Sequence, residues 1–195
     1  MSDSLAIVDV GVIHGRFQIF HNDHLKYLLA GKELCRHLVI GITNPDPVLT
    51  RVDYTNPGRS TLLANPLTYY ERYVMLRNVL RENGMASDEY SIVPLPINLP
   101  DLYKYYVPLD ALFFLTIYDE WGRQKLRFFN SLGLNTQVLW ERPLEQKGLT
   151  SHAIRTAIME EKPWQHLVPP PVPVLMEQWQ IRKRLLTLHQ KARKD

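Results

Sequence analysis

Near the start of the chain, residues 15–25 read Gly15-Arg16-Phe17-Gln18-Ile19-Phe20-His21-Asn22-Asp23-His24-Leu25. An apolar run ending at Ile13 precedes them and predicts a strand, and helical spacing follows from Asp23. A glycine after the strand lets backbone come close to a ligand at the strand's carboxyl end, where open α/β sheets bind ligands. The following helix turns its unpaired N–H groups toward the same space, and such groups favour phosphate. The segment therefore predicts an anion site at the first strand–helix turn.

His21 and His24 are three residues apart, so on a first helical turn both imidazoles project to one side. Two imidazoles over a helix N-terminus suit a polyphosphate, because they donate hydrogen bonds and gain protons beside negative charge. The same spacing is also found in ordinary surface or capping histidines. A metal site could recruit His14 as a third imidazole, but no Cys or carboxylate stands at useful spacing to complete it. The segment is neither a Walker A loop nor a dinucleotide glycine triplet.

Apolar runs rich in β-branched residues recur along the chain and predict buried strands at residues 6–13, 38–43, 90–95, 111–116 and 136–140. Helical spacing separates several of them and predicts helices at residues 23–36, 68–82 and 120–132. This alternation predicts an α/β fold, with a Rossmann-like doubly wound five-stranded parallel sheet.

The remaining segments predict one long loop and a helical tail. Residues 44–66 make a proline-containing loop whose length suits either a functional, mobile element or a tolerated insertion. Prolines 169–171 are expected to block any helix, and residues 172–194 to form one final helix with a basic end. We therefore expect a single domain over residues 1–195, with a core at about 5–165 and a C-terminal helical extension over 166–195.

Composition sets further limits. The chain has 195 residues, 45% of them hydrophobic, and a net charge of +3, which excludes disordered, collagenous and disulfide-scaffold proteins. That charge is too weak to predict a nucleic-acid surface. No apolar run reaches the roughly 18 residues of a membrane span. The lone Cys35 and an N-terminus unlike a signal peptide favour a cytoplasmic protein without membrane or nucleic-acid partners.

Residues 15–25 resemble the GRFQPFHxGHL signature of the HIGH-type nucleotidylyltransferase superfamily, and more narrowly that of archaeal-type nicotinamide-mononucleotide (NMN) adenylyltransferases. Three further blocks follow in family order: 65–72 is similar to NPFTxxER, 149–155 to ISSTxIR, and 164–169 to a W-x-x-L-V-P close. The chain departs from the pattern at Ile19 (proline in the family), Asp23 (glycine) and His152 (a hydroxyl residue). Asp23 could cap the helix but would repel phosphate, so these departures leave the substrate more open than the reaction class.

The resemblance implies transfer of AMP from ATP to nicotinamide (or nicotinate) mononucleotide, giving NAD and pyrophosphate, with Mg²⁺ accompanying the triphosphate. It implies catalytic roles for His21, His24 and Arg155. It also implies that these three contact ATP together with Gly15, Arg16, Phe17, Thr150 and Ser151. From the residues alone, Arg155 could be a surface helical arginine and Thr150-Ser151 a helix cap. Since archaeal-type relatives form oligomers, we expect a homo-oligomer.

The acceptor site is predicted from residues that follow the fourth strand. Trp121 could stack on a flat ring, Asp119 could accept a hydrogen bond, and Arg123 could meet an acceptor phosphate. Equally, Asp119 could cap a helix while Trp121 packs into the core. Two other functions remain open: transfer to another phosphate acceptor or from CTP, and a nucleotide-binding regulatory module that kept the pocket.

Overall fold

A computed structural model describes residues 7–50 and 60–193 of the chain. Its centre is a five-stranded sheet in the order β3-β2-β1-β4-β5, and every pairing is parallel. The strands are β1 (Val8–Gly15), β2 (Cys35–Thr43), β3 (Tyr90–Leu95), β4 (Leu112–Ile117) and β5 (Asn135–Glu141). The predicted doubly wound parallel sheet is therefore confirmed. Each predicted strand is present: β3 has the predicted bounds, and the ends of the other strands shift by at most three residues.

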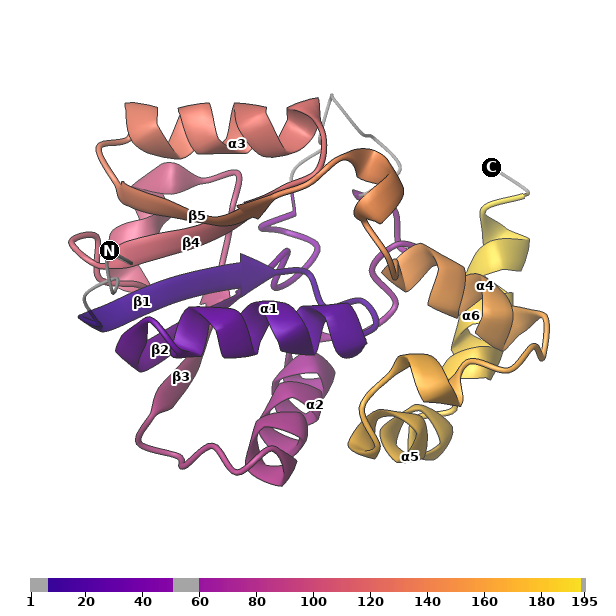
Figure 1. Cartoon of the computed structure of the whole chain (residues 1–195). Coiled ribbons are helices and arrows are strands. Elements are labelled where there is room, and N and C mark those ends of the chain that lie inside the picture. Colours follow the sequence, from indigo (N-terminus) through magenta and orange to yellow (C-terminus); the bar gives the residue numbers. More distant parts are fainter. Residues whose placement is uncertain (1–6, 51–59, 194–195) are drawn as a thin grey trace.

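Helices cover both faces of the sheet (Figure 1). One face carries α1 (Asn22–Lys32) and α2 (Tyr69–Glu82), and the other carries α3 (Glu120–Ser131) and a short 3-10 turn, η2 (Pro100–Tyr105). Neighbouring β1 residues point to opposite faces, so Ile13 joins the larger apolar cluster under α1 and α2, and Val12 joins the smaller cluster under α3. Two apolar layers thus hold the sheet in place.

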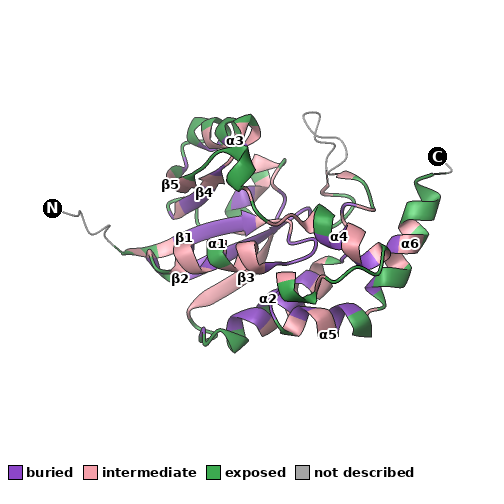
Figure 2. Ribbon diagram, turned by 45° about the vertical axis from the view of Figure 1, so that its right-hand side comes forward, coloured by how far each residue is buried: buried purple, intermediate pink, exposed green. Residues whose placement is uncertain are grey.

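The C-terminal part differs from the single helix predicted over residues 172–194. It forms α4 (Ser151–Met159), α5 (Pro171–Gln178) and α6 (Ile181–Lys191), joined in part by short turns, η3 (Leu144–Gln146) and η4 (Gln165–Leu167) before α4 and α5. Gln180 adopts a left-handed conformation with φ of 51° and breaks the predicted helix in two. The break lets apolar residues of both helices reach the larger cluster: Val172, Leu175, Met176, Ile181 and Leu185. Figure 2 shows buried stretches on both α5 and α6.

Several predicted boundaries were also wrong. Prolines do not block α5, because Pro171 occupies its first turn, where a missing N–H costs nothing. The helix predicted over 23–36 ends at Lys32, since Cys35 is already buried in β2 and paired with Val8. The ends of the predictions at Ala6 and Lys194 lie outside the described residues, as do residues 51–59 of the long loop.

The strand order places the site-forming loops together. The chain leaves β3 at one edge and returns beside β1 as β4, so the order reverses between β1 and β4. At such a switch point the loops after the two strands diverge to opposite faces and open a crevice at their carboxyl ends. The loop after β1 carries the predicted phosphate segment. Within residues 7–50 and 60–193, every helix falls short of the length and apolar character that crossing a membrane would need.

The packing at Gly11 predicts a test of this core. A methyl group there would overlap the Phe114 ring and lie 2.9 Å from the Cys35 Sγ. We expect Gly11→Ala to lower the free energy of unfolding by about 1–3 kcal/mol, because Phe114 and Cys35 are themselves buried and have little room to move. Urea unfolding measures this loss. Gly84→Asn is the matched control, since Gly84 has φ of +77° and open space around it. Equal stability of the Gly11→Ala and wild-type proteins would contradict the packing argument.

Candidate functional site

The turn after β1 is tightly folded. Phe17 adopts φ of 52°, and its ring lies against Gly15, where a Cβ would come within 2.7 Å of the ring. Gly15 is therefore required for a close approach, although the group that approaches in this structure is Phe17. The Gln18 side chain is buried and pairs with the backbone of Leu67: its Nε2 donates to the Leu67 carbonyl and its Oε1 accepts from the Leu67 N–H. The turn is thereby fixed against the start of α2.

The two motif histidines lie side by side at the N-terminus of α1. Their rings stack with centroids 3.6 Å apart, and the His24 ring meets Phe17 edge-on at 5.1 Å. His21 is the N-cap residue, because its Nδ1 accepts the His24 backbone N–H at 3.3 Å. Since Nδ1 accepts, the neutral ring carries its proton on Nε2, which leaves a donor available to a phosphate oxygen.

Burial keeps both imidazoles uncharged at neutral pH. Desolvation lowers the pKa of His21 to about 4, with a small opposing effect from Asp23. Desolvation also lowers the pKa of His24, and the neighbouring His21 and Arg16 lower it further. The His24 Nδ1 is buried without a hydrogen-bond partner in the part of the chain that the structure describes. An arriving polyphosphate would reverse this balance, because negative charge favours the protonated rings.

The late motif binds directly to the early one. Thr150 is the N-cap of α4 and accepts the Ala153 N–H, while the Ser151 hydroxyl donates to the Ile19 carbonyl at 2.9 Å. Arg155 is 5% exposed and donates through Nη1 to the Gln18 carbonyl. The structure therefore brings the predicted arginine and the histidine segment together, although more than a hundred residues separate them in sequence.

Asp23, which stands at a family glycine position, has a structural partner. Its Oδ2 accepts the Leu149 N–H at 2.7 Å and its Oδ1 meets the Lys26 ammonium at 3.0 Å. These bonds lower the pKa of Asp23 against the opposing effect of its partial burial. A side chain at Gly148 would collide with this carboxylate, and Gly148 also has φ of +58°. Asp23 thus ties α1 to the loop before α4.

The residues predicted for the acceptor are all engaged by other side chains. Asp119 caps α3 through the Gly122 N–H, and its Oδ2 pairs with the Lys147 ammonium at 2.9 Å. Trp121 is half-buried outside both apolar clusters, with the Lys125 ammonium 4.4 Å from its ring centroid. Arg123 pairs with Glu141 at 2.6 Å. The predicted capping role of Asp119 is observed, whereas Trp121 does not pack into the core.

His14 does not join the other two histidines. Its ring lies 5.2 Å from Phe129 under α3, and neither of its nitrogens has a hydrogen-bond partner among the described residues. Burial and the nearby Lys125 lower its pKa. Across residues 7–50 and 60–193, no three His, Cys, Asp or Glu side chains come together in a way that could hold a metal ion.

Sequence reasoning assigned no role to Arg72, although it is the last residue of the block 65–72. It is 1% exposed and donates to the carbonyl of Arg16, just after β1, and to that of Thr43 at the end of β2. A signal existed: the buried face of α2 comprises Arg72, Met75, Leu76, Val79 and Leu80, which is helical spacing with an arginine on the apolar stripe. An arginine in that position has to find polar partners inside the protein.

The turn after β1 lies at the switch point of the sheet and is joined to the N-terminal part of α4. The comparisons with known proteins give the class: the chain is a nucleotidyltransferase. The chain belongs to the Cytidylyltransferase-like family, whose model matches residues 12–157. The resemblance to the wider nucleotidylyltransferase superfamily is therefore confirmed.

Individual relatives carry two different activities in their names. The chain is 46% identical to a phosphonoformate cytidylyltransferase of Streptomyces viridochromogenes, over 92% of this chain and 96% of the relative. It is 32% identical to a nicotinamide-nucleotide adenylyltransferase of Thermococcus sibiricus, over 82% of this chain and 78% of the relative.

A solved structure shares the fold. A bifunctional NMN adenylyltransferase/ADP ribose pyrophosphatase from Francisella tularensis aligns with a TM-score of 0.67 and 16% identity. The alignment covers 93% of this chain and 53% of that chain, so this chain spans about half of its length.

The stacked histidines predict a large effect on turnover. We expect His24→Ala to lower turnover by several hundredfold, because it removes roughly 3–4 kcal/mol of charge stabilisation from the transition state. Steady-state pyrophosphate release measures this effect with the substrates that the wild-type protein uses. The control is His189→Ala, since His189 is exposed on α6. Unchanged turnover of His24→Ala would refute the catalytic role.

The low pKa of His21 predicts acid sensitivity. The unfolded chain gains a proton near pH 6.5 and the folded chain only near the pKa of about 4, so stability falls as the pH drops between these values. His21→Asn keeps an N-cap acceptor but does not titrate. Between pH 7 and pH 5, we expect wild type to lose about 1–2 kcal/mol more unfolding free energy than the variant. Urea unfolding at both pH values measures the difference, and parallel losses would contradict the assignment.

Proposed function

We propose that this protein transfers a cytidylyl group from CTP to a small phosphonate or phosphate acceptor and releases pyrophosphate. The observation that carries the proposal is 46% identity to a phosphonoformate cytidylyltransferase over nearly the whole of both chains. Because that similarity extends over 96% of the relative, it includes the segments that would form an acceptor site as well as the phosphate turn. Phosphonoformate itself, a phosphonate joined directly to a carboxylate, is the first acceptor to test.

In the proposed reaction, an acceptor oxygen attacks the α-phosphorus of CTP in line. A new P–O bond joins the acceptor to CMP, the bond from the α-phosphorus to the β-phosphate oxygen breaks, and pyrophosphate leaves. The attacking oxygen is already anionic, so the protein needs no strong base. Its contribution is to position the two anions and to neutralise their charge.

The described residues supply donors for that role. The Nε2–H of His21 and the remaining N–H groups at the start of α1 would donate to an anion over the helix N-terminus. His24 stacks against His21, so an anion that binds over one ring lies close to both, and its negative charge would favour protonation there. Arg16 and the start of α4, with Thr150 and Ser151, would contact the remaining phosphates.

Mg²⁺ would accompany the triphosphate. The residues of this site are imidazoles, arginines and hydroxyl groups, and none of the described acidic clusters offers the oxygen ligands of a protein-held magnesium ion. The ion would therefore be bound mainly by phosphate oxygens and water, and it would reduce the charge of the leaving pyrophosphate.

The contacts around Trp121 also support a small acceptor. The Lys125 ammonium covers one face of the indole, Asp119 is paired with Lys147, and Arg123 is paired with Glu141. A pyridine nucleotide would have to displace such contacts in order to stack its ring on Trp121 and to bind its phosphate at Arg123. An acceptor without a ring would not have to stack on Trp121, so the Lys125 contact could remain in place.

Adenylyl transfer from ATP to NMN is the second candidate. It is favoured by the 32% identity to the Thermococcus sibiricus nicotinamide-nucleotide adenylyltransferase and by the four sequence blocks that resemble such enzymes. The two candidates share the phosphate site, and they differ in the base that is selected and in the acceptor.

A two-by-two substrate panel tests the proposal. Pyrophosphate release is measured with CTP or ATP and with phosphonoformate or NMN, in the presence of Mg²⁺, and His24→Ala protein serves as the background control. We expect CTP with phosphonoformate to exceed every other combination by about a hundredfold, because a site that hydrogen-bonds one base leaves polar groups unpaired with the other.

Each other outcome replaces the proposal with a defined alternative. Release only with ATP and NMN would establish the second candidate. Release with CTP and a different phosphate acceptor would keep cytidylyl transfer and change the acceptor. Nucleotide binding without turnover over an extended acceptor panel would indicate a regulatory module that retains the pocket.

A further inference from the structure

Arg72 is a buried arginine whose hydrogen bonds all go to backbone carbonyls. Nη1 donates to the carbonyls of Arg16 at 3.0 Å and Thr43 at 2.7 Å, and Nη2 donates to Asn44 at 2.7 Å and Pro45 at 3.3 Å. Its Nε donates to the Thr68 carbonyl at 3.2 Å within α2. One guanidinium therefore joins the loop after β1, which carries the phosphate segment, to the loop after β2.

The charge of Arg72 is not neutralised by an ion pair in the described part of the chain. Desolvation lowers the pKa of Arg72 to about 10, so the group is still a cation at neutral pH. Arg155, which donates to the Gln18 carbonyl, is buried and unpaired in the same way. Two buried cations therefore hold the loop after β1 at residues 16 and 18. Burying a cation without a counter-ion destabilises the fold, and an anionic substrate at the loop would offset part of that desolvation energy.

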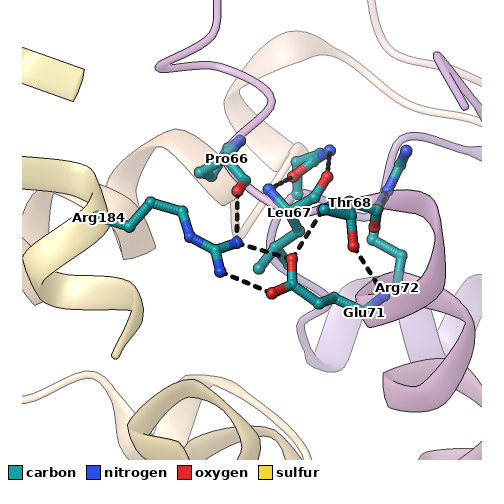
Figure 3. Close-up of polar contacts among 7 residues, drawn as sticks. Pro66, Leu67, Thr68, Glu71, Arg72 and Arg184 are labelled. Atoms are coloured by element: carbon teal, nitrogen blue, oxygen red, sulfur yellow. Dashed lines mark hydrogen bonds and ion pairs between the residues drawn. The ribbon is translucent and has the colours of Figure 1, made fainter. Parts of the chain in front are cut away.

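Glu71 is the acidic neighbour of Arg72 in sequence, and although its charge raises the pKa of Arg72, its carboxylate is bonded to other groups. Arg184 on α6 donates to both carboxylate oxygens of Glu71, from Nη1 to Oε2 at 2.7 Å and from Nη2 to Oε1 at 2.7 Å. Glu71 also accepts the Thr68 N–H in the capping box of α2. Figure 3 shows Arg184 reaching Glu71 from the C-terminal helix while Arg72 lies on the other side of Thr68. The Glu71 carboxylate thus has its hydrogen-bond donors from Arg184 and Thr68, and none of them comes from Arg72.

We propose that Arg72 is a positioning residue for nucleotidyl transfer: it fixes the loop after β1 and places a buried positive charge behind the triphosphate. Arg184, contributed by the C-terminal extension, preserves that charge by binding the carboxylate of the adjacent Glu71. The inference rests on the proposed function only in placing a triphosphate at this loop. It does not depend on the base or on the acceptor.

Inorganic tripolyphosphate with Mg²⁺, titrated calorimetrically, tests the charge directly. Arg72→Lys keeps the positive charge but cannot bridge two loops, and Arg72→Gln keeps a donor without the charge. We expect Arg72→Gln to weaken binding by about tenfold and Arg72→Lys by no more than about threefold. Arg77→Gln, exposed on the same helix, is the control and should bind as wild type. Equal weakening by both Arg72 variants, or wild-type binding by Arg72→Gln, would overturn the proposal.

A second pair of variants leaves Arg72 in place and so avoids its folding role. Arg184→Met frees the Glu71 carboxylate beside Arg72. We expect it to weaken tripolyphosphate binding about threefold or more, because the unpaired carboxylate would then offset the charge of Arg72 and repel the anion. Adding Glu71→Gln should restore it. A purely structural clamp predicts no recovery in the double variant, and that result would overturn the role of the pair. If the tripolyphosphate pattern holds but no nucleotide is turned over, the proposed function fails and this inference stands.

Discussion

The carbonyl groups of the loop after β1 are held by side chains that come from distant parts of the chain. Arg72 binds the carbonyl of Arg16, Arg155 binds that of Gln18, and the Ser151 hydroxyl binds that of Ile19. Buried backbone carbonyls need donors, and a loop outside the sheet ladder has no neighbouring strand to supply them. The shape of the phosphate segment therefore depends on α2 and α4 being packed in place, and on the C-terminal helices that pack against them.

The same contacts explain how the proposed anion site could form in a chain with almost balanced charge. The nearby carboxylates are each turned to another partner, Asp23 to the Leu149 N–H and Glu71 to Arg184. The histidines are uncharged in the free protein because burial lowers their pKa values. Around the loop after β1, the described residues consequently include imidazole donors and two buried cations, while Asp23 and Glu71 are bonded elsewhere. The proposed polyphosphate would require little movement of these groups.

Prediction succeeded where the signal was local and failed where packing decided the outcome. Each strand and the helices α1, α2 and α3 follow from apolar periodicity, and the parallel sheet follows from their alternation. The long C-terminal helix was wrong because nothing in the local spacing reveals the left-handed Gln180 that folds α6 back beside α4 and α5. The contacts of Arg155 could not be predicted either, since an arginine on a short helix suits solvent equally well.

By itself, the sequence determined the order of strands and helices and the placement of His21 and His24 on one helical turn, because backbone periods of two and 3.6 residues are properties of neighbouring residues. Only the tertiary structure decided which groups meet. Asp23 accepts the N–H of Leu149, 126 positions away, and Arg184 pairs with Glu71, 113 positions away. Arg155 donates to the carbonyl of Gln18, 137 positions away. A hydrogen bond forms with whichever partner tertiary packing brings within about 3 Å. The spacing of the neighbouring residues in the sequence does not reveal which partner that is.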